Sequence, residues 1–171
     1  MKFQVYDEDG FLSLVNTDQY QTFVDEDWSL EQLLEHFVAE MNSRNIIVWQ
    51  TSSDGGGEWT VEVLDKPTDK PAFRSFAKTI EVSNGTLYLV NYTDLTMAAQ
   101  FADITLPEEE NADWKITLPN GKYEVTVRQM FDLNELEEDA DQTAFEIIIN
   151  NENLHNNNVV QKIFWWEEHG S

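Results

Sequence analysis

The feature that most limits how this chain can fold is the alternation of apolar and polar residues around two Asn-Gly pairs. The run KTIEVSNGTLYLVNY alternates on both sides of Asn84-Gly85, and WKITLPNGKYEVTVRQMF does so around Asn120-Gly121. Side chains alternate between the two faces of a strand, and Asn-Gly favours the type I′ turn of a tight hairpin. The pattern predicts two β-hairpins in the middle of the chain.

Further short runs extend this β pattern towards both ends of the chain. KFQVY and FLSLV flank the acidic tetrapeptide DEDG, which predicts two strands joined by a turn. NIIVWQT and EWTVEVL flank a glycine-rich loop in the same way, and TAFEIII predicts a later strand. Two prolines in DKPTDKPAF favour an extended linker. The final VVQKIFWWEE is expected to pack back on the sheet as a strand or short helix.

One segment has the spacing of a helix. After Asp27 and Ser29, either of which is suited to cap a helix, apolar residues recur three or four positions apart up to Met41. The acids Glu31, Glu35 and Glu40 lie largely off this stripe. We expect an amphipathic helix over about 29–43, with the apolar stripe in the core. A second, short helix capped by Thr93 is compatible with TDLTMAAQF.

These elements predict an antiparallel β-sandwich-like fold, all-β or α+β, with one packed amphipathic helix at about 29–43. Alternating β and α units are missing from the pattern, which argues against a parallel doubly wound sheet. The length of 171 residues predicts a single domain over 1–171.

The charge of the chain is strongly negative and limits its partners. Thirty-three Asp and Glu against ten Lys and Arg give a formal net charge of −23. Such a charge disfavours nucleic acids and anionic membranes, and it favours a basic protein partner. No apolar run approaches the ~20 residues of a membrane span. The chain has no Cys, and we expect a cytoplasmic location.

The acids are concentrated in two blocks that lack basic residues. Ten acids lie between Phe3 and Ser43, and eight lie between Gln129 and Gln161. The decapeptide DLNELEEDAD at 132–141 is the densest stretch. A basic partner is expected to contact the most concentrated acids of the two blocks, which are Asp25, Glu26, Asp27, Asp132, Glu135, Glu137, Glu138, Asp139 and Asp141.

The sequence predicts no catalytic residues, no metal site and no cofactor. His36 and Glu40 lie one helical turn apart, but a metal site needs three or four ligands. The decapeptide lacks the glycine and the ligand spacing of an EF-hand loop. The glycines at 55–57 precede a predicted strand, whereas a phosphate loop precedes a helix.

Part of the chain resembles a known class of domain. The stretch KTIEVSNGTLYLVNY followed by ITLPNGKYEVTV is similar to small bacterial nuclease-inhibitor domains of the competence-associated type, and to immunity-type β domains. The residues that match are Leu118, Pro119, Gly121 and Tyr123. The resemblance implies a β-rich inhibitor and assigns no functional residue.

Three functions remain open from the sequence. The first is an acidic protein-binding domain, an inhibitor or immunity protein that acts on a basic nuclease or toxin. The second is an acidic domain with a structural or scaffolding role and no cationic target. The third, an enzyme, would be a hydrolase that uses surface carboxylates.

Overall fold

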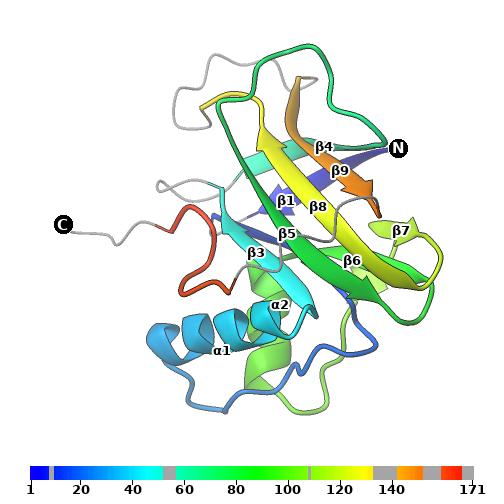
Figure 1. The fold of residues 1–171 in the computed structure, drawn as a ribbon. Helices are drawn as coiled ribbons and strands as arrows, with labels where there is room; N and C mark the ends of the chain where they lie inside the picture. Colours follow the sequence, from blue (N-terminus) through cyan, green and yellow to red (C-terminus); the bar gives the residue numbers. More distant parts are fainter. Residues whose placement is uncertain (8–9, 52–56, 108, 133–141, 152–158, 167–171) are drawn as a thin grey trace.

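The fold is taken from a computed structural model of the chain (Figure 1). The structure describes residues 1–7, 10–51, 57–107, 109–132, 142–151 and 159–166.

Two sheets form the body of the molecule. The five-stranded sheet contains, in spatial order, β1 (Lys2–Asp7), β4 (Gly57–Leu64), β9 (Thr143–Asn150), β8 (Gly121–Gln129) and β5 (Arg74–Val82). The four-stranded sheet contains β3 (Ile46–Gln50), β2 (Phe11–Val15), β6 (Thr86–Asn91) and β7 (Lys115–Thr117). Neighbouring strands are antiparallel except β4 and β9, which are parallel.

Two α-helices cover the outer face of the four-stranded sheet. Helix α1 (Leu30–Asn42) begins at Ser29, whose hydroxyl accepts a hydrogen bond from Gln32 N at 3.1 Å. Helix α2 (Tyr92–Gln100) begins at Asn91, whose amide oxygen accepts from Asp94 N at 3.0 Å. Asn91 therefore caps α2, and the prediction of Thr93 as the cap is wrong. A short 3-10 helix, η1 (Glu109–Asn111), precedes β7.

The middle sheet is buried on both faces, so the molecule has three layers. In β2, Leu12 and Leu14 enter the core between the two sheets, whereas Phe11 and Val15 enter the core beneath the helices. In β3, Trp49 faces the first of these cores. Burial on both faces accounts for the unbroken apolar runs of these strands.

The predicted fold class is confirmed: the fold is α+β, with two mostly antiparallel sheets in a sandwich-like arrangement and an amphipathic helix at Leu30–Asn42. A second helix, α2, is present in addition. Residues 65–73 form neither helix nor strand, as the two prolines predicted. In the part of the chain that the structure describes, no helix is long and apolar enough to cross a membrane.

The predicted hairpins are wrong, although the strands predicted up to TAFEIII are present. Residues 159–166, expected as a strand or short helix, form an isolated bridge at Phe164 instead. Strands β5 and β6 flank Asn84-Gly85 but belong to different sheets, and β7 and β8 flank Asn120-Gly121 in the same way. The strands on either side of DEDG, β1 and β2, are also divided between the sheets, as are β3 and β4. These connections turn from one sheet to the other.

The two Asn-Gly turns contact each other at one end of the sandwich. Gly85 has a φ of 70°, but Asn84 keeps a negative φ, so the turn is not type I′. Gly85 N donates to Asn120 Oδ1 at 2.7 Å, and Leu118 N donates to Gly85 O at 3.1 Å. Each turn therefore binds the other instead of closing a hairpin of its own.

Candidate functional site

The first predicted acidic group is displayed next to the helices. Asp25, Glu26 and Asp27 are exposed and lie between β2 and α1. The backbone N–H groups of Val24 and Asp25 donate to Ala99 O at 2.9 and 3.2 Å. These bonds fix the start of the acidic segment against the carboxyl end of α2. The backbone that leads into these three carboxylates is thus attached to α2 by two hydrogen bonds.

Large apolar side chains are exposed beside the same segment. Phe23 is 46% exposed, and Met97 and Phe101, at the end of α2, are 40% and 41% exposed. The hydrogen bonds to Ala99 place Phe23 near this end of α2. We call Phe23, Asp25, Glu26, Asp27, Met97 and Phe101 the acidic-apolar patch.

The second predicted acidic group is only partly described. Asp132 is half-buried and follows β8, whereas Glu135, Glu137, Glu138, Asp139 and Asp141 lie outside the described residues. The end of β8, which Asp132 follows, lies at the opposite end of the molecule from the segment between β2 and α1 that carries Asp25–Asp27 (Figure 1). The structure therefore does not bring Asp132 together with Asp25, Glu26 and Asp27.

A groove of about 540 Å³ runs beside α1. One wall is α1, which contributes Leu30, Glu31, Leu34, Glu35 and Val38. The other wall is the segment 159–166, here called the C-terminal strap, which contributes Gln161, Lys162, Ile163 and Trp166. The floor is apolar, and the rim carries Glu31 and Glu35 on one side and Lys162 on the other.

This groove was not predicted, because the whole apolar stripe of the helix was expected to lie in the core. Leu33, Phe37 and Met41 are fully buried. Leu30 is 43% exposed, and Leu34 and Val38 are half-buried. The spacing of four from Leu30 to Leu34 to Val38 marks a second row of the helix. This second row is the sequence pattern that could have indicated the groove. The pattern does not show what would cover these three side chains.

The C-terminal strap is held in place by backbone and side-chain contacts. Phe164 pairs with the edge of β3: its N–H donates to Val48 O at 3.1 Å, and its carbonyl accepts from Gln50 N at 3.0 Å. Asn42, at the end of α1, bonds to both the N–H and the carbonyl of Val160. The guanidinium of Arg74 lies 4.2 Å from the ring centre of Trp165. Both walls of the groove are therefore anchored.

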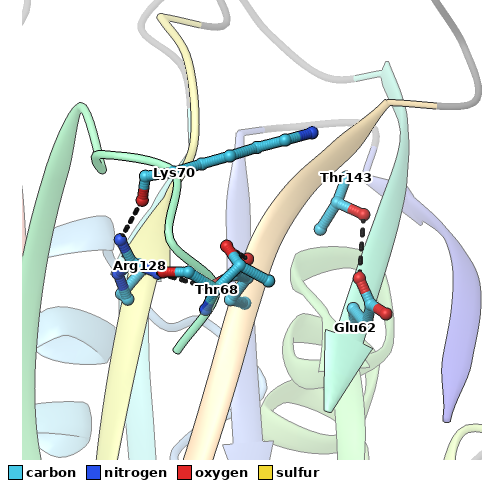
Figure 2. A network of polar contacts seen from close by, with 6 residues as sticks. Glu62, Thr68, Lys70, Arg128 and Thr143 are labelled. Atoms are coloured by element: carbon cyan, nitrogen blue, oxygen red, sulfur yellow. Dashed lines mark hydrogen bonds and ion pairs between the residues drawn. The ribbon is translucent and has the colours of Figure 1, made fainter. Parts of the chain in front are cut away.

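A second, smaller hollow of about 90 Å³ lies on the five-stranded sheet, and its lining residues are Glu62, Thr68, Lys70, Met130, Gln142, Thr143 and Glu146. Figure 2 shows its polar contacts, which connect residues 68–70 with β8 and β9. Glu146 is only 2% exposed and forms an ion pair with Arg128 at 2.5 Å. It also accepts from the backbone and hydroxyl groups of Thr68, and Arg128 donates to the carbonyls of Thr68 and Lys70.

This network fixes a loop and leaves no free base at Glu146. Both of its carboxylate oxygens already accept hydrogen bonds. Glu62, on the neighbouring strand, accepts from Thr143 at 3.1 Å (Figure 2). The result is a firm attachment of the 65–73 segment to the sheet from which the acidic decapeptide departs.

A second buried carboxylate is Asp7, the last residue of β1. Asp7 is 1% exposed and accepts hydrogen bonds from Gly10 N, Phe11 N, the Thr51 hydroxyl and the Trp59 indole. Burial raises the pKa of the Asp7 carboxyl above its ordinary value of 3.8, although the four donors oppose the shift. Through these hydrogen bonds Asp7 holds Gly10 and Phe11 at the start of β2, and Thr51 after β3, next to Trp59 of β4. Its role is therefore structural.

His36 and Glu40, considered above as possible metal ligands, bind the segment between β2 and α1. His36 Nε2 lies 2.6 Å from Gln21 O, and Glu40 accepts from Gln21 N and from the Asn45 side chain. Burial, and then the nearby Glu40 carboxylate, raise the pKa of Tyr20. Among the described residues, no three His, Asp or Glu side chains are grouped as metal ligands would be.

Comparisons with known proteins place the fold. No protein-family model matches the chain, and no curated protein is similar to it in sequence. The solved structure of crocagin biosynthetic gene J is similar, with a TM-score of 0.59 and 11% identity over 86% of this chain and 94% of that one. At this identity the similarity shows a shared fold.

A second solved structure is similar at a lower level. It is ComJ, the inhibitor of the DNA-degrading activity of NucA from Bacillus subtilis, with a TM-score of 0.37 and 12% identity over 87% of this chain and 96% of that one. This weak structural similarity is to a protein of the class that the sequence resembles.

Proposed function

We propose that this chain is an acidic protein-binding domain that inhibits, or gives immunity against, a basic protein such as a nuclease or toxin. The observation that carries this proposal is the acidic-apolar patch. Asp25, Glu26 and Asp27 are exposed beside large exposed apolar side chains, on a backbone fixed to α2. Charged groups around apolar anchors are the usual composition of a protein interface.

The charge of the whole molecule supports the same proposal. A net charge of −23 attracts a cationic partner and speeds its encounter with the domain. ComJ is an inhibitor of a nuclease activity, so inhibition of a nuclease is a role that a known protein has. Its low structural similarity adds nothing further, and the proposal rests on the charge and the patch of this chain.

A role in binding, and not in catalysis, is also what the buried carboxylates favour. Asp7 and Glu146 are each occupied by several hydrogen bonds that hold loops in place. Asp132, with Glu135, Glu137, Glu138, Asp139 and Asp141, is proposed as a second partner-binding group. The end of β8, which Asp132 follows, lies far from the patch, so we expect Asp132 and the patch to contact different parts of a partner (Figure 1).

The test compares two triple variants of equal charge. Asp25→Asn/Glu26→Gln/Asp27→Asn neutralises the patch, and Glu58→Gln/Asp65→Asn/Asp69→Asn neutralises exposed acids on and after β4. The wild-type chain is used to capture and purify its partner, and association rates are then measured at several salt concentrations. We expect a basic partner, slower association of the patch variant, and a weaker dependence on salt.

Two results would contradict the proposal. One is a captured partner with no excess of basic residues. The other is equal association rates and salt slopes for the two triple variants, which would show that the patch has no special role. Neutralising the acids of 132–141 in a separate variant tests the second group in the same assay.

A further inference from the structure

The groove beside α1 has the geometry of a site for a short segment of polypeptide. Its α1 wall extends from Leu30 to Val38, which is about 12 Å at 1.5 Å per residue. This length accommodates about two helical turns or four extended residues. Leu34 and Val38, which are half-buried, form an apolar floor that is left open in the described structure, and Ile163, which is 2% exposed, lines the same groove.

The two walls differ in charge. Glu31 and Glu35 are exposed on the α1 wall, one turn apart, and α1 itself has no Lys or Arg. Asp25, Glu26 and Asp27 precede the same end of the helix. Lys162, on the C-terminal strap, is the only basic side chain among the lining residues. A bound segment would therefore meet negative charge along one side and a single positive charge on the other.

We propose that this groove binds a cationic amphipathic segment of the protein partner. Apolar side chains of that segment would lie on Leu34, Val38 and Ile163, and its Lys or Arg side chains would face Glu31 and Glu35. This inference rests on the proposed function and adds the chemistry of the recognised segment. An apolar floor with a charged rim is the arrangement by which grooves recognise amphipathic segments.

A second copy of the chain is a poorer occupant on electrostatic grounds. Each copy carries a charge of −23, and a symmetric contact would bring the two acidic α1 walls together. An acidic segment would be repelled by Glu31 and Glu35 in the same way. The apolar floor, in turn, distinguishes this site from a general attraction of cations to an acidic surface.

The probe is a synthetic peptide of Leu and Lys, with Leu at helical spacing, fluorescein-labelled and blocked at both ends. Its binding to the full chain is measured by fluorescence anisotropy. Glu31→Gln/Glu35→Gln is expected to weaken binding about 2- to 10-fold, because two exposed ion pairs are lost. Leu34→Ser is expected to weaken it about 10-fold or more through loss of the apolar floor.

Matched variants separate the groove from the overall charge. Glu58→Gln/Glu109→Gln removes the same two charges from sites outside the groove and is expected to change the affinity by less than 2-fold. Lys162→Gln is expected to strengthen binding about 2-fold, because it removes a repulsive charge from the rim. Leu30→Ser, at an exposed floor edge, provides a second apolar variant if Leu34→Ser fails to fold.

Four outcomes would overturn the inference. They are an equal loss of affinity for both double charge variants, no loss for either apolar variant, self-association of the chain that the peptide does not disrupt, and a gain of 10-fold or more when residues 167–171 are deleted. The last would show that the chain's own end occupies the groove. A captured basic partner that responds to the Asp25–Asp27 variant and not to Glu31→Gln/Glu35→Gln would sustain the proposed function while rejecting the groove.

Discussion

Asp7 shows how one residue joins several parts of the chain at an electrostatic cost. Its carboxylate accepts hydrogen bonds from two backbone N–H groups, a hydroxyl and an indole, at a site that is nearly closed to water. Burial nevertheless raises its pKa above 3.8. Between the ordinary and the raised pKa, the folded state binds more protons than the unfolded state. The free energy of unfolding therefore falls as the pH rises through that interval.

Replacing Asp7 by Asn should remove this dependence on pH. The Asn side chain still offers an oxygen to Gly10 N and Phe11 N, and it carries no charge to desolvate. The free energy of unfolding of Asp7→Asn, relative to wild type, should rise with pH above 3.8 and then level off. Urea denaturation at a series of pH values measures this difference, with the exposed Asp65→Asn as the control for lost charge. A relative stability that falls with rising pH would contradict the assignment.

The ion pair between Arg128 and Glu146 gives a second prediction for single residues. Arg128→Met leaves the Glu146 carboxylate buried without its cation and should cost about 3 kcal/mol of stability. The double variant Arg128→Met/Glu146→Gln should regain most of that loss, because no charge is then left buried. Urea denaturation of the two single variants and the double variant completes the cycle. A cost of the double variant equal to the sum of the two single costs would show that the pair is not coupled.

These buried carboxylates could not have been predicted from the sequence. Asp7 and Glu146 are two of 33 acids, and the neighbours that bury them come from distant segments such as Trp59 and Thr68. Of the predicted site residues that the structure describes, Asp25, Glu26 and Asp27 are exposed as expected. Their surroundings, the end of α2, are also distant in sequence and give no local pattern.

Among the elements, α1 was the most predictable because its signals are local. The stripe of apolar residues and the Ser29 cap lie within one short segment, and the helix and its cap are confirmed. The expected burial of the stripe is confirmed for Leu33, Phe37 and Met41 and is wrong for Leu30, which is exposed. Strands were also predicted well, since alternation marks them one by one. The pairing of the strands was predicted wrongly. Inward-facing residues on both sides of a turn are expected in a hairpin, and they are equally expected where a turn connects one sheet to the other. Ile80 and Leu87 flank Asn84-Gly85 and face the same core from opposite sheets.

The cap of α1 can be tested directly. Ser29→Ala removes the acceptor for Gln32 N and should cost about 1 kcal/mol of stability. Ser29→Asp retains an acceptor and should be close to wild type. Both are measured by urea denaturation. Equal stabilities of the Ala and Asp variants would show that the side chain of Ser29 does not support the helix.

At the scale of the whole molecule, the net charge opposes the compact state. Repulsion among 33 acids is only partly offset by ten basic residues, and salt screens it over ~8–10 Å. Raising the NaCl concentration from about 10 to about 200 mM should therefore raise the thermal midpoint by roughly 2–4 °C, which corresponds to about 1 kcal/mol. Differential scanning calorimetry measures the midpoint. A lower midpoint at the higher salt would show that favourable ion pairs outweigh the repulsion.

The three-layer arrangement also bears on whether residues 1–171 unfold as one unit. The core between the sheets and the core beneath the helices share the middle sheet, because β2 and β3 contribute alternate residues to each. Loss of either core would expose one face of that sheet and weaken the other core. We therefore propose that the chain behaves as a single domain, with both cores lost in the same transition.

Two core variants test this proposal from opposite faces of the middle sheet. Leu14→Ala opens a cavity between the sheets and should cost about 2–5 kcal/mol, and Phe37→Ala opens one beneath α1 and should cost about 3–5 kcal/mol. In each variant, tryptophan fluorescence and far-ultraviolet circular dichroism should report the same urea midpoint. Separate midpoints for the two signals in Phe37→Ala would mean that the helix layer unfolds independently of the sandwich, and the chain would then contain two cooperative units.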